Sequence, residues 1–116
     1  MVKIAQQALD DKKASDIVAF DVRKISEVTD FHVVATGLST PHLKALASEV
    51  QHALKEKGVP SHRRAGDPES GWVVLDYVDV VIHVFMPDVR QYYALEDLWG
   101  KAKPQGRSRK KTSPGR

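Results

Sequence analysis

The stretch GWVVLDYVDVVIHVFM, residues 71–86, decides the fold. It contains two β-branched segments, 72–77 and 79–86, and short runs of this kind indicate strands. About one turn separates them, which predicts an antiparallel hairpin. The second segment is apolar almost throughout, as is typical of a central strand that is covered on both faces.

The residues before this hairpin predict further strands. Segments 16–22 and 31–36 are also β-branched and are bounded by polar or turn-forming residues. Residues 61–65 are expected to form a short edge strand, because three of them are His or Arg and suit a solvated position. Together with the hairpin, these segments predict a sheet of about five strands.

Helices are expected on either side of these strands. Apolar residues at helical spacing predict a first helix over 2–13. Ser39 and Pro41 provide the cap and the first-turn proline of a second helix, which ends at Gly58. A third helix is expected over 88–99. This order predicts a single α/β (mixed α+β) domain whose mixed sheet is flanked by helices.

Length and composition agree with one domain. A chain of 116 residues can bury one core. It has no apolar run near the roughly 20 residues of a membrane-spanning helix, and its first residues lack the apolar region of a signal peptide. The absence of cysteine excludes disulfides and thiolate metal sites. A cytoplasmic location is therefore expected.

The charges divide the chain into a domain, 1–100, and a tail, 101–116. The tail holds seven basic residues and no acidic one. The domain keeps 11 of the 18 basic residues and all 15 acidic ones, so its net charge is −4. The tail is rich in Pro, Gly and Ser and is expected to be disordered. Two roles stay open for it, a solubilising extension and a weak tether to the RNA backbone.

The polar residues give little indication of catalysis. The five histidines lack the spacing of a zinc site, and His83 is expected to be a neutral, hydrogen-bonded residue inside its strand. Asp76, Asp79 and the turn at 36–40 would suit metal-dependent nucleotidyl transfer. A third acid and a glycine-rich loop are missing, and capping or turn roles explain these residues more simply. We expect no catalytic residue, metal or cofactor.

The aromatic residues indicate more. Both tryptophans and all three tyrosines lie between Trp72 and Trp99. On the expected last helix, Tyr92, Leu95 and Trp99 form one apolar row, and a second row begins beside it. A single helix on one sheet cannot easily bury both rows. Core packing and contact with a partner both stay open as interpretations.

Four groups of residues share the order and gaps of one family pattern: DIVA at 16–19 with TDF at 29–31, TGxS at 36–39, GWVVLDYVDVVIHVF at 71–85, and RxxYxLExLW at 90–99. Together they resemble the Iojap/ribosomal silencing factor family. The resemblance covers nearly all of residues 1–100 and leaves the tail outside. Val78 departs from it, because the family usually has glycine at this point of the hairpin turn.

The resemblance implies a nucleotidyltransferase-like fold without the catalytic apparatus, and a homodimer when the protein is free. It also implies binding to a ribosomal protein on the intersubunit face of the large ribosomal subunit, which blocks subunit joining and represses translation. An acidic domain suits a basic protein better than rRNA. Carried over residue by residue, the partner contacts are Trp72, Asp76, Tyr77, Arg90, Tyr93, Leu95, Leu98 and Trp99.

Three hypotheses follow. The first is a ribosome-binding factor that prevents subunit association, without enzymatic activity or a membrane partner. The second is a nucleotidyltransferase-like enzyme that uses Asp76 and Asp79. The third is an RNA-binding domain that acts through the basic tail.

Overall fold

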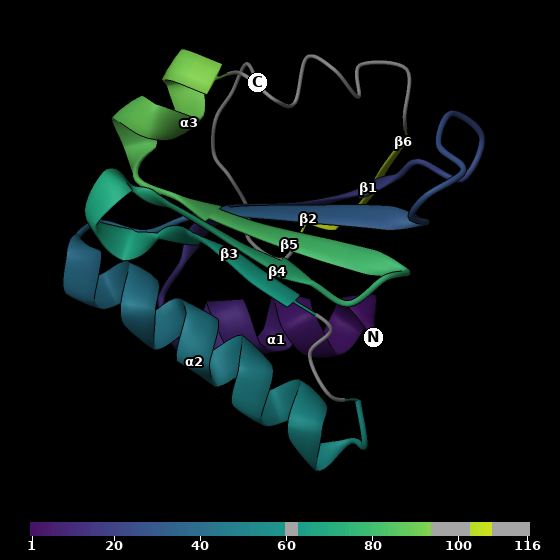
Figure 1. Ribbon diagram of the computed structural model, residues 1–116, viewed down its shortest axis with the longest axis horizontal. Coiled ribbons are helices and arrows are strands. Elements are labelled where there is room, and N and C mark those ends of the chain that lie inside the picture. Colours follow the sequence, from purple (N-terminus) through teal and green to yellow (C-terminus); the bar gives the residue numbers. More distant parts are fainter. Residues whose placement is uncertain (60–62, 94–102, 108–116) are drawn as a thin grey trace.

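The computed structural model describes residues 1–59, 63–93 and 103–107, which form one sheet with helices (Figure 1). The strands lie in the order β3-β4-β5-β2-β1-β6. Only the β2–β5 pair is parallel, and the other neighbours are antiparallel. The predicted mixed α/β class is confirmed. The elements are α1 (Val2–Asp11), β1 (Ser15–Asp21), β2 (Phe31–Thr36), α2 (Thr40–Glu56), β3 (Arg63–Asp67), the 3-10 turn η1 (Pro68–Ser70), β4 (Trp72–Asp76), β5 (Val80–Phe85), α3 (Pro87–Tyr93) and β6 (Lys103–Arg107).

The hairpin predicted from residues 71–86 is present as β4 and β5. Trp72 pairs with Phe85 at one end, and Asp76 pairs with Val81 at the other. β5 lies inside the sheet between β4 and β2, and five of its six residues are buried. The prediction of a central strand is therefore confirmed.

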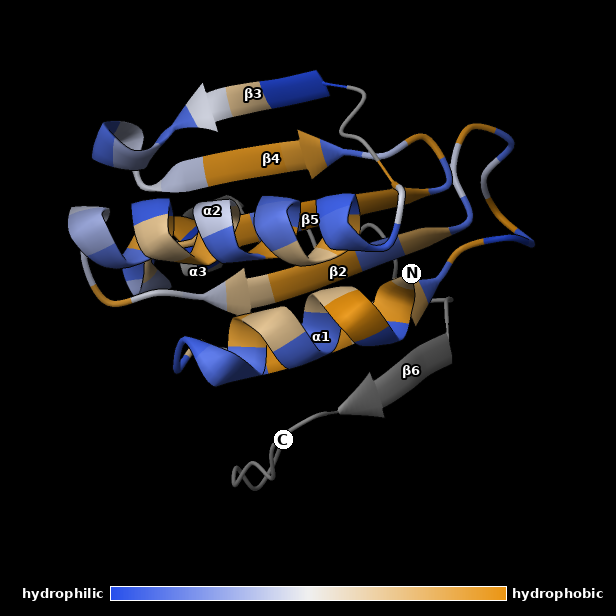
Figure 2. Cartoon of the chain, turned by 90° about the horizontal axis from the view of Figure 1, so that it is seen from below, coloured by the Kyte–Doolittle hydropathy of each residue, from blue (hydrophilic) through white to orange (hydrophobic). Residues whose placement is uncertain are grey.

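The two longer helices cover one face of the sheet, whereas α3 lies beyond one end of the strands on the other side (Figures 1 and 2). α2 starts as predicted, with the Ser39 hydroxyl accepting a hydrogen bond from the His42 amide at 3.2 Å and with Pro41 in the first turn. No helix among residues 1–59, 63–93 and 103–107 is long and apolar enough to cross a membrane.

Alternation along the strands creates two apolar layers. The layer between the sheet and its two covering helices includes Leu9, Leu46, Leu75 and Ile82, none of them more than 1% exposed. The other face carries a smaller group, here called the opposite-face cluster. Its buried members are Phe20, Val22, Val34 and Phe85, and Val18, Trp72 and Val89 pack against them.

Two parts of the sheet differ from the sequence-based expectation. The edge strand β3 spans Arg63–Asp67 and so ends two residues later than expected, and all of its residues are exposed. Residues 61 and 62 of the expected strand lie outside the described residues. Residues 103–107, expected to be disordered, pair with β1 as β6. Without β6, β1 would be an edge strand with unsatisfied backbone groups, and the added strand satisfies them. The strand propensity of residues 103–107 alone does not reveal this pairing. Residues 94–102 and 108–116 lie outside the description.

Candidate functional site

The face of the sheet away from α1 and α2 carries a stack of rings. The centroids of Trp72 and Phe85 are 5.1 Å apart, and that of His83 lies 6.3 Å from Trp72 and 6.1 Å from Phe85. Phe85 is buried, whereas Trp72 is only half-buried. Trp72 therefore helps to cover the sheet and keeps part of its surface accessible.

His83 of this stack also forms a close pair with a second histidine, His32. Nδ1 of His32 lies 3.0 Å from Nε2 of His83, so one ring donates a hydrogen bond and the other accepts it. Burial lowers the pKa of His32 to about 4. Burial, and then repulsion from His32, lowers the pKa of His83 to about 3. The predicted hydrogen bond of His83 is present, and its lowered pKa agrees with the predicted neutral ring.

Arg90 fixes the start of α3 to the sheet. Its guanidinium donates to the Asp16 carbonyl at 2.9 Å and to the Thr36 hydroxyl at 2.6 Å. These bonds tie α3 to β1 and β2, and the neighbouring Val89 packs against the opposite-face cluster near Trp72. The structure thus gives Arg90 a positioning role. Its direct contact with a partner stays a prediction.

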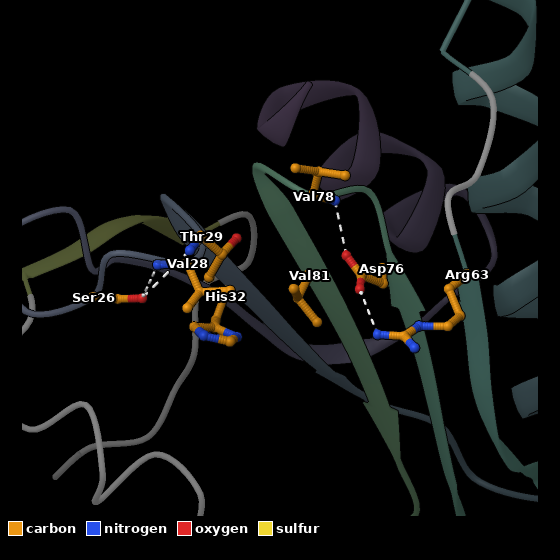
Figure 3. A pocket seen from close by; sticks show the side chains of 8 residues that line it. All are labelled: Ser26, Val28, Thr29, His32, Arg63, Asp76, Val78 and Val81. Atoms are coloured by element: carbon orange, nitrogen blue, oxygen red, sulfur yellow. Dashed lines mark hydrogen bonds and ion pairs between the residues drawn. The ribbon is translucent and has the colours of Figure 1, made fainter.

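The other end of β4 borders a cavity of about 380 Å³ (Figure 3). Its lining comes from the 26–32 segment, from Arg63 on β3, and from Asp76, Val78 and Val81 of the hairpin. Asp76 accepts a hydrogen bond from the Val78 amide at 2.8 Å, and its second oxygen lies 3.7 Å from the Arg63 guanidinium. Asp76 therefore shapes the turn while its carboxylate stays partly accessible.

The remaining predicted contact residues have mixed outcomes. Tyr77 is only 5% exposed and packs in the core between the sheet and the helices, where burial raises the pKa of its phenol. A partner cannot reach such a ring readily, so the predicted contact is replaced by a core role. Tyr93 is the last residue of α3. Leu95, Leu98 and Trp99 lie outside the described residues.

The groups of the nucleotidyl-transfer hypothesis lie at opposite ends of the sheet. Asp76 and Asp79 flank the β4–β5 turn, whereas the 36–40 segment follows the far end of β2, where Thr36 pairs with Phe85. The length of β5 puts roughly 15 Å between them. Within the described ranges, no group of three or more His, Cys, Asp or Glu is placed to hold a metal ion. Capping and turn roles account for these residues.

The comparison with known proteins agrees with this arrangement. Residues 1–115 match the model of the family described as "Ribosomal silencing factor during starvation". The chain belongs to the ribosomal silencing factor family. The ribosomal silencing factor RsfS of Bacillus subtilis is 43% identical over 102 residues, which cover 88% of this chain and 86% of that protein.

A solved structure supports the same fold, and a further relative is similar in sequence. A crystal structure of a Chromobacterium violaceum protein superimposes with a TM-score of 0.82 at 45% identity, covering 89% of this chain and 86% of that one. A more distant mouse relative, named "Mitochondrial assembly of ribosomal large subunit protein 1", is 32% identical over 91 residues. These residues cover 76% of this chain and 40% of the mouse protein.

The cavity at the end of β4 contains residues that sequence reasoning missed as site residues. Val28 and Val78 are apolar residues in turn segments, and both are exposed. Their occurrence in otherwise polar turns was the available signal. Arg63 was interpreted only as an edge-strand residue, because nothing in the sequence brings it to Asp76.

Proposed function

We propose that this protein binds a ribosomal protein on the intersubunit face of the large ribosomal subunit and blocks subunit joining, which represses translation. The observation that carries the proposal is the match to ribosomal silencing factors over residues 1–115. The name of the mouse relative, which refers to the ribosomal large subunit, supports the choice of subunit.

Charge and geometry favour a protein as the direct partner. Residues 1–100 have a net charge of −4, which attracts a basic ribosomal protein and repels the phosphates of rRNA. Trp72 and Asp76 lie on the same face of β4, about 13 Å apart, beside the exposed edge strand β3. An aromatic surface next to a carboxylate suits a partner that presents Arg or Lys.

The proposal includes further properties of the protein. It acts in the cytoplasm, is a homodimer when free, and regulates translation without catalysing a reaction. Residues 1–100 carry the activity, and residues 101–116 add at most a weak contact with rRNA. The names of the relatives, which describe silencing factors, support a regulatory role.

Sedimentation of purified ribosomal subunits tests the function directly. Large subunits are incubated with the protein before small subunits are added, and the fraction of joined ribosomes is measured on a sucrose gradient. We expect the protein to travel with large subunits and to reduce joining in proportion to its occupancy. Normal joining at full occupancy would contradict the proposed mechanism.

Two substitutions test the proposed contact surface. Trp72→Ala should weaken binding by about 2 kcal/mol if the ring is an interface hot spot. Because Trp72 also packs on Phe85, the folding of the Trp72→Ala variant must be checked by circular dichroism. Asp76→Asn can still accept the Val78 amide bond, so it removes the charge and keeps the turn. Glu56→Gln, on the exposed end of α2, is the matched charge control.

The tail hypothesis needs a separate variant. Replacing Arg109, Lys110 and Lys111 with glutamine leaves β6 unchanged and removes three cations. Under our proposal this variant keeps most of its binding. Complete loss of binding, with a steep salt dependence in the unsubstituted protein, would instead favour the RNA-binding hypothesis.

A further inference from the structure

Two exposed apolar residues lie where β2 and β5 begin. Val28 is 86% exposed and Val78 is 51% exposed. Val28 and Val78 line the cavity at the end of β4 from two loops that are far apart in the sequence (Figure 3). We call these two residues and the cavity the strand-end patch. Exposed apolar side chains that share one rim are a common mark of a binding surface.

Hydrogen bonds between side chains and backbone amides hold the rim in place. The Ser26 hydroxyl accepts bonds from the amides of Val28 and Thr29, at 3.2 and 3.3 Å. On the opposite side, Asp76 accepts the amide of Val78 at 2.8 Å. The apolar side chains are therefore presented by ordered turns, so that little conformational entropy would be lost when a partner binds.

The backbone of Val78 adds a second indication. Its φ is 72°, in the left-handed region, which a β-branched residue adopts only at a cost in energy. Burial of its side chain does not offset this cost, because half of the residue is exposed. Strain without burial is what a residue selected for contact with another molecule would show.

The charges around the patch identify the kind of partner. Segments 21–30 and 76–81 contain five carboxylates, and with Arg63 they contain three cations. One of these cations, Arg23, donates to Asp21 at 2.9 Å, and this hydrogen bond lowers the pKa of that carboxyl to about 2. Acidic side chains therefore outnumber basic ones around the patch. An acidic rim repels nucleic acid and attracts a basic polypeptide.

We infer that the strand-end patch docks a basic protein segment, which inserts an apolar side chain between Val28 and Val78 and places a Lys or Arg near Asp76 and Asp79. The inference rests on the proposed function and extends it, since the segment would belong to the ribosomal protein that the large subunit presents. Asp76 then links this patch to the Trp72 surface on the same strand.

Two variants on separate loops test the patch. Val78→Gly removes the side chain and also relieves the backbone strain, so the melting temperature should not fall. Val28→Ser removes the more exposed of the two side chains. Each should weaken binding to purified large subunits about tenfold, the effect of losing one buried valine. Leu38→Ser is the matched control, because Leu38 is 70% exposed but follows the far end of β2.

Charge reversal distinguishes the type of partner. Asp79→Lys should weaken binding to a basic protein, whereas it would strengthen binding to rRNA, and the second result would overturn our choice of partner. The size of the free protein is measured by sedimentation velocity for every variant. If Val28→Ser and Val78→Gly dissociate a dimer but bind subunits normally, the patch joins two copies of the chain and the inference is wrong.

The outcomes separate this inference from the function on which it rests. If the unsubstituted protein binds subunits and blocks joining while both valine variants do so equally well, the patch is refuted and the proposed function stands. If the unsubstituted protein does not bind large subunits, both are wrong. Tenfold weaker binding by both variants, with normal binding by Leu38→Ser, supports the patch.

Discussion

Acidification from pH 7 to pH 5 should destabilise the protein through His83. In the folded chain, burial and the neighbouring His32 hold the pKa of His83 at about 3, compared with 6.5 for an exposed imidazole. Between these two values, the unfolded chain binds a proton that the folded chain does not. Stability is therefore complete above pH 6.5 and is lost progressively as the pH falls towards 3.

The magnitude follows from the same two values. At pH 5, the unfolded imidazole is almost fully charged and the folded one is neutral, so His83 should contribute about 2 kcal/mol of destabilisation relative to pH 7. His32, whose pKa is lowered to about 4 by burial, acts in the same direction. Its effect should be smaller, because its ring is only partly buried and solvent screens the charge.

Urea unfolding followed by circular dichroism at pH 7 and pH 5 measures this loss. His83→Gln has no titrating group at this position, so its loss between the two pH values should be about 2 kcal/mol smaller than that of the unsubstituted protein. The difference between the two proteins removes the contribution of the groups that do not interact with His83 and leaves that of His83 together with its coupling to His32. Equal losses in the two proteins would refute the reasoning, as would an NMR titration in which the His83 ring protonates near pH 6.5.

Two substitutions test how the elements are held. Ser39→Ala removes the hydroxyl that caps α2 and should lower the free energy of unfolding by about 1 kcal/mol, measured by urea denaturation; an unchanged midpoint would contradict the capping role. Gly66→Ala should cost about 2 kcal/mol or more, because the new methyl group would lie 2.3 Å from the Trp72 carbonyl oxygen at a φ of +85°. Thermal unfolding measures this loss, and a melting temperature within a degree of the original would exclude the strain.

The strands and the first two helices could be predicted because their signals are local. The β-branched runs in residues 72–85 mark the two strands of the hairpin, and the Ser39 cap marks where α2 begins. β6 could not be predicted in this way. Lys103–Arg107 has no apolar pattern, and its strand conformation depends on pairing with β1, a property of the sheet as a whole.

The candidate site was harder to predict, because it depends on which loops meet. Trp72 and Asp76 are expected contacts because the family resemblance implies them, and the structure leaves both partly accessible. Tyr77 looked like a contact residue and is instead in the core, because its strand face turns towards the helices. The cavity unites residues from three segments, and no spacing along the chain shows that Val28 and Val78 line the same cavity.

The parallel pairing of β2 with β5 also affects how the chain folds. It brings Phe31 beside Val80, 49 residues later, and all of α2 and β3 lie between them. Closing a loop of this length costs about 3 kcal/mol of chain entropy before any contact compensates for it. The β4–β5 hairpin and α2 can form locally first. We therefore expect the pairing of β2 with β5 to be the slowest step of folding. Until this pairing forms, the unpaired edge of β2 would be the part of the chain most prone to aggregate.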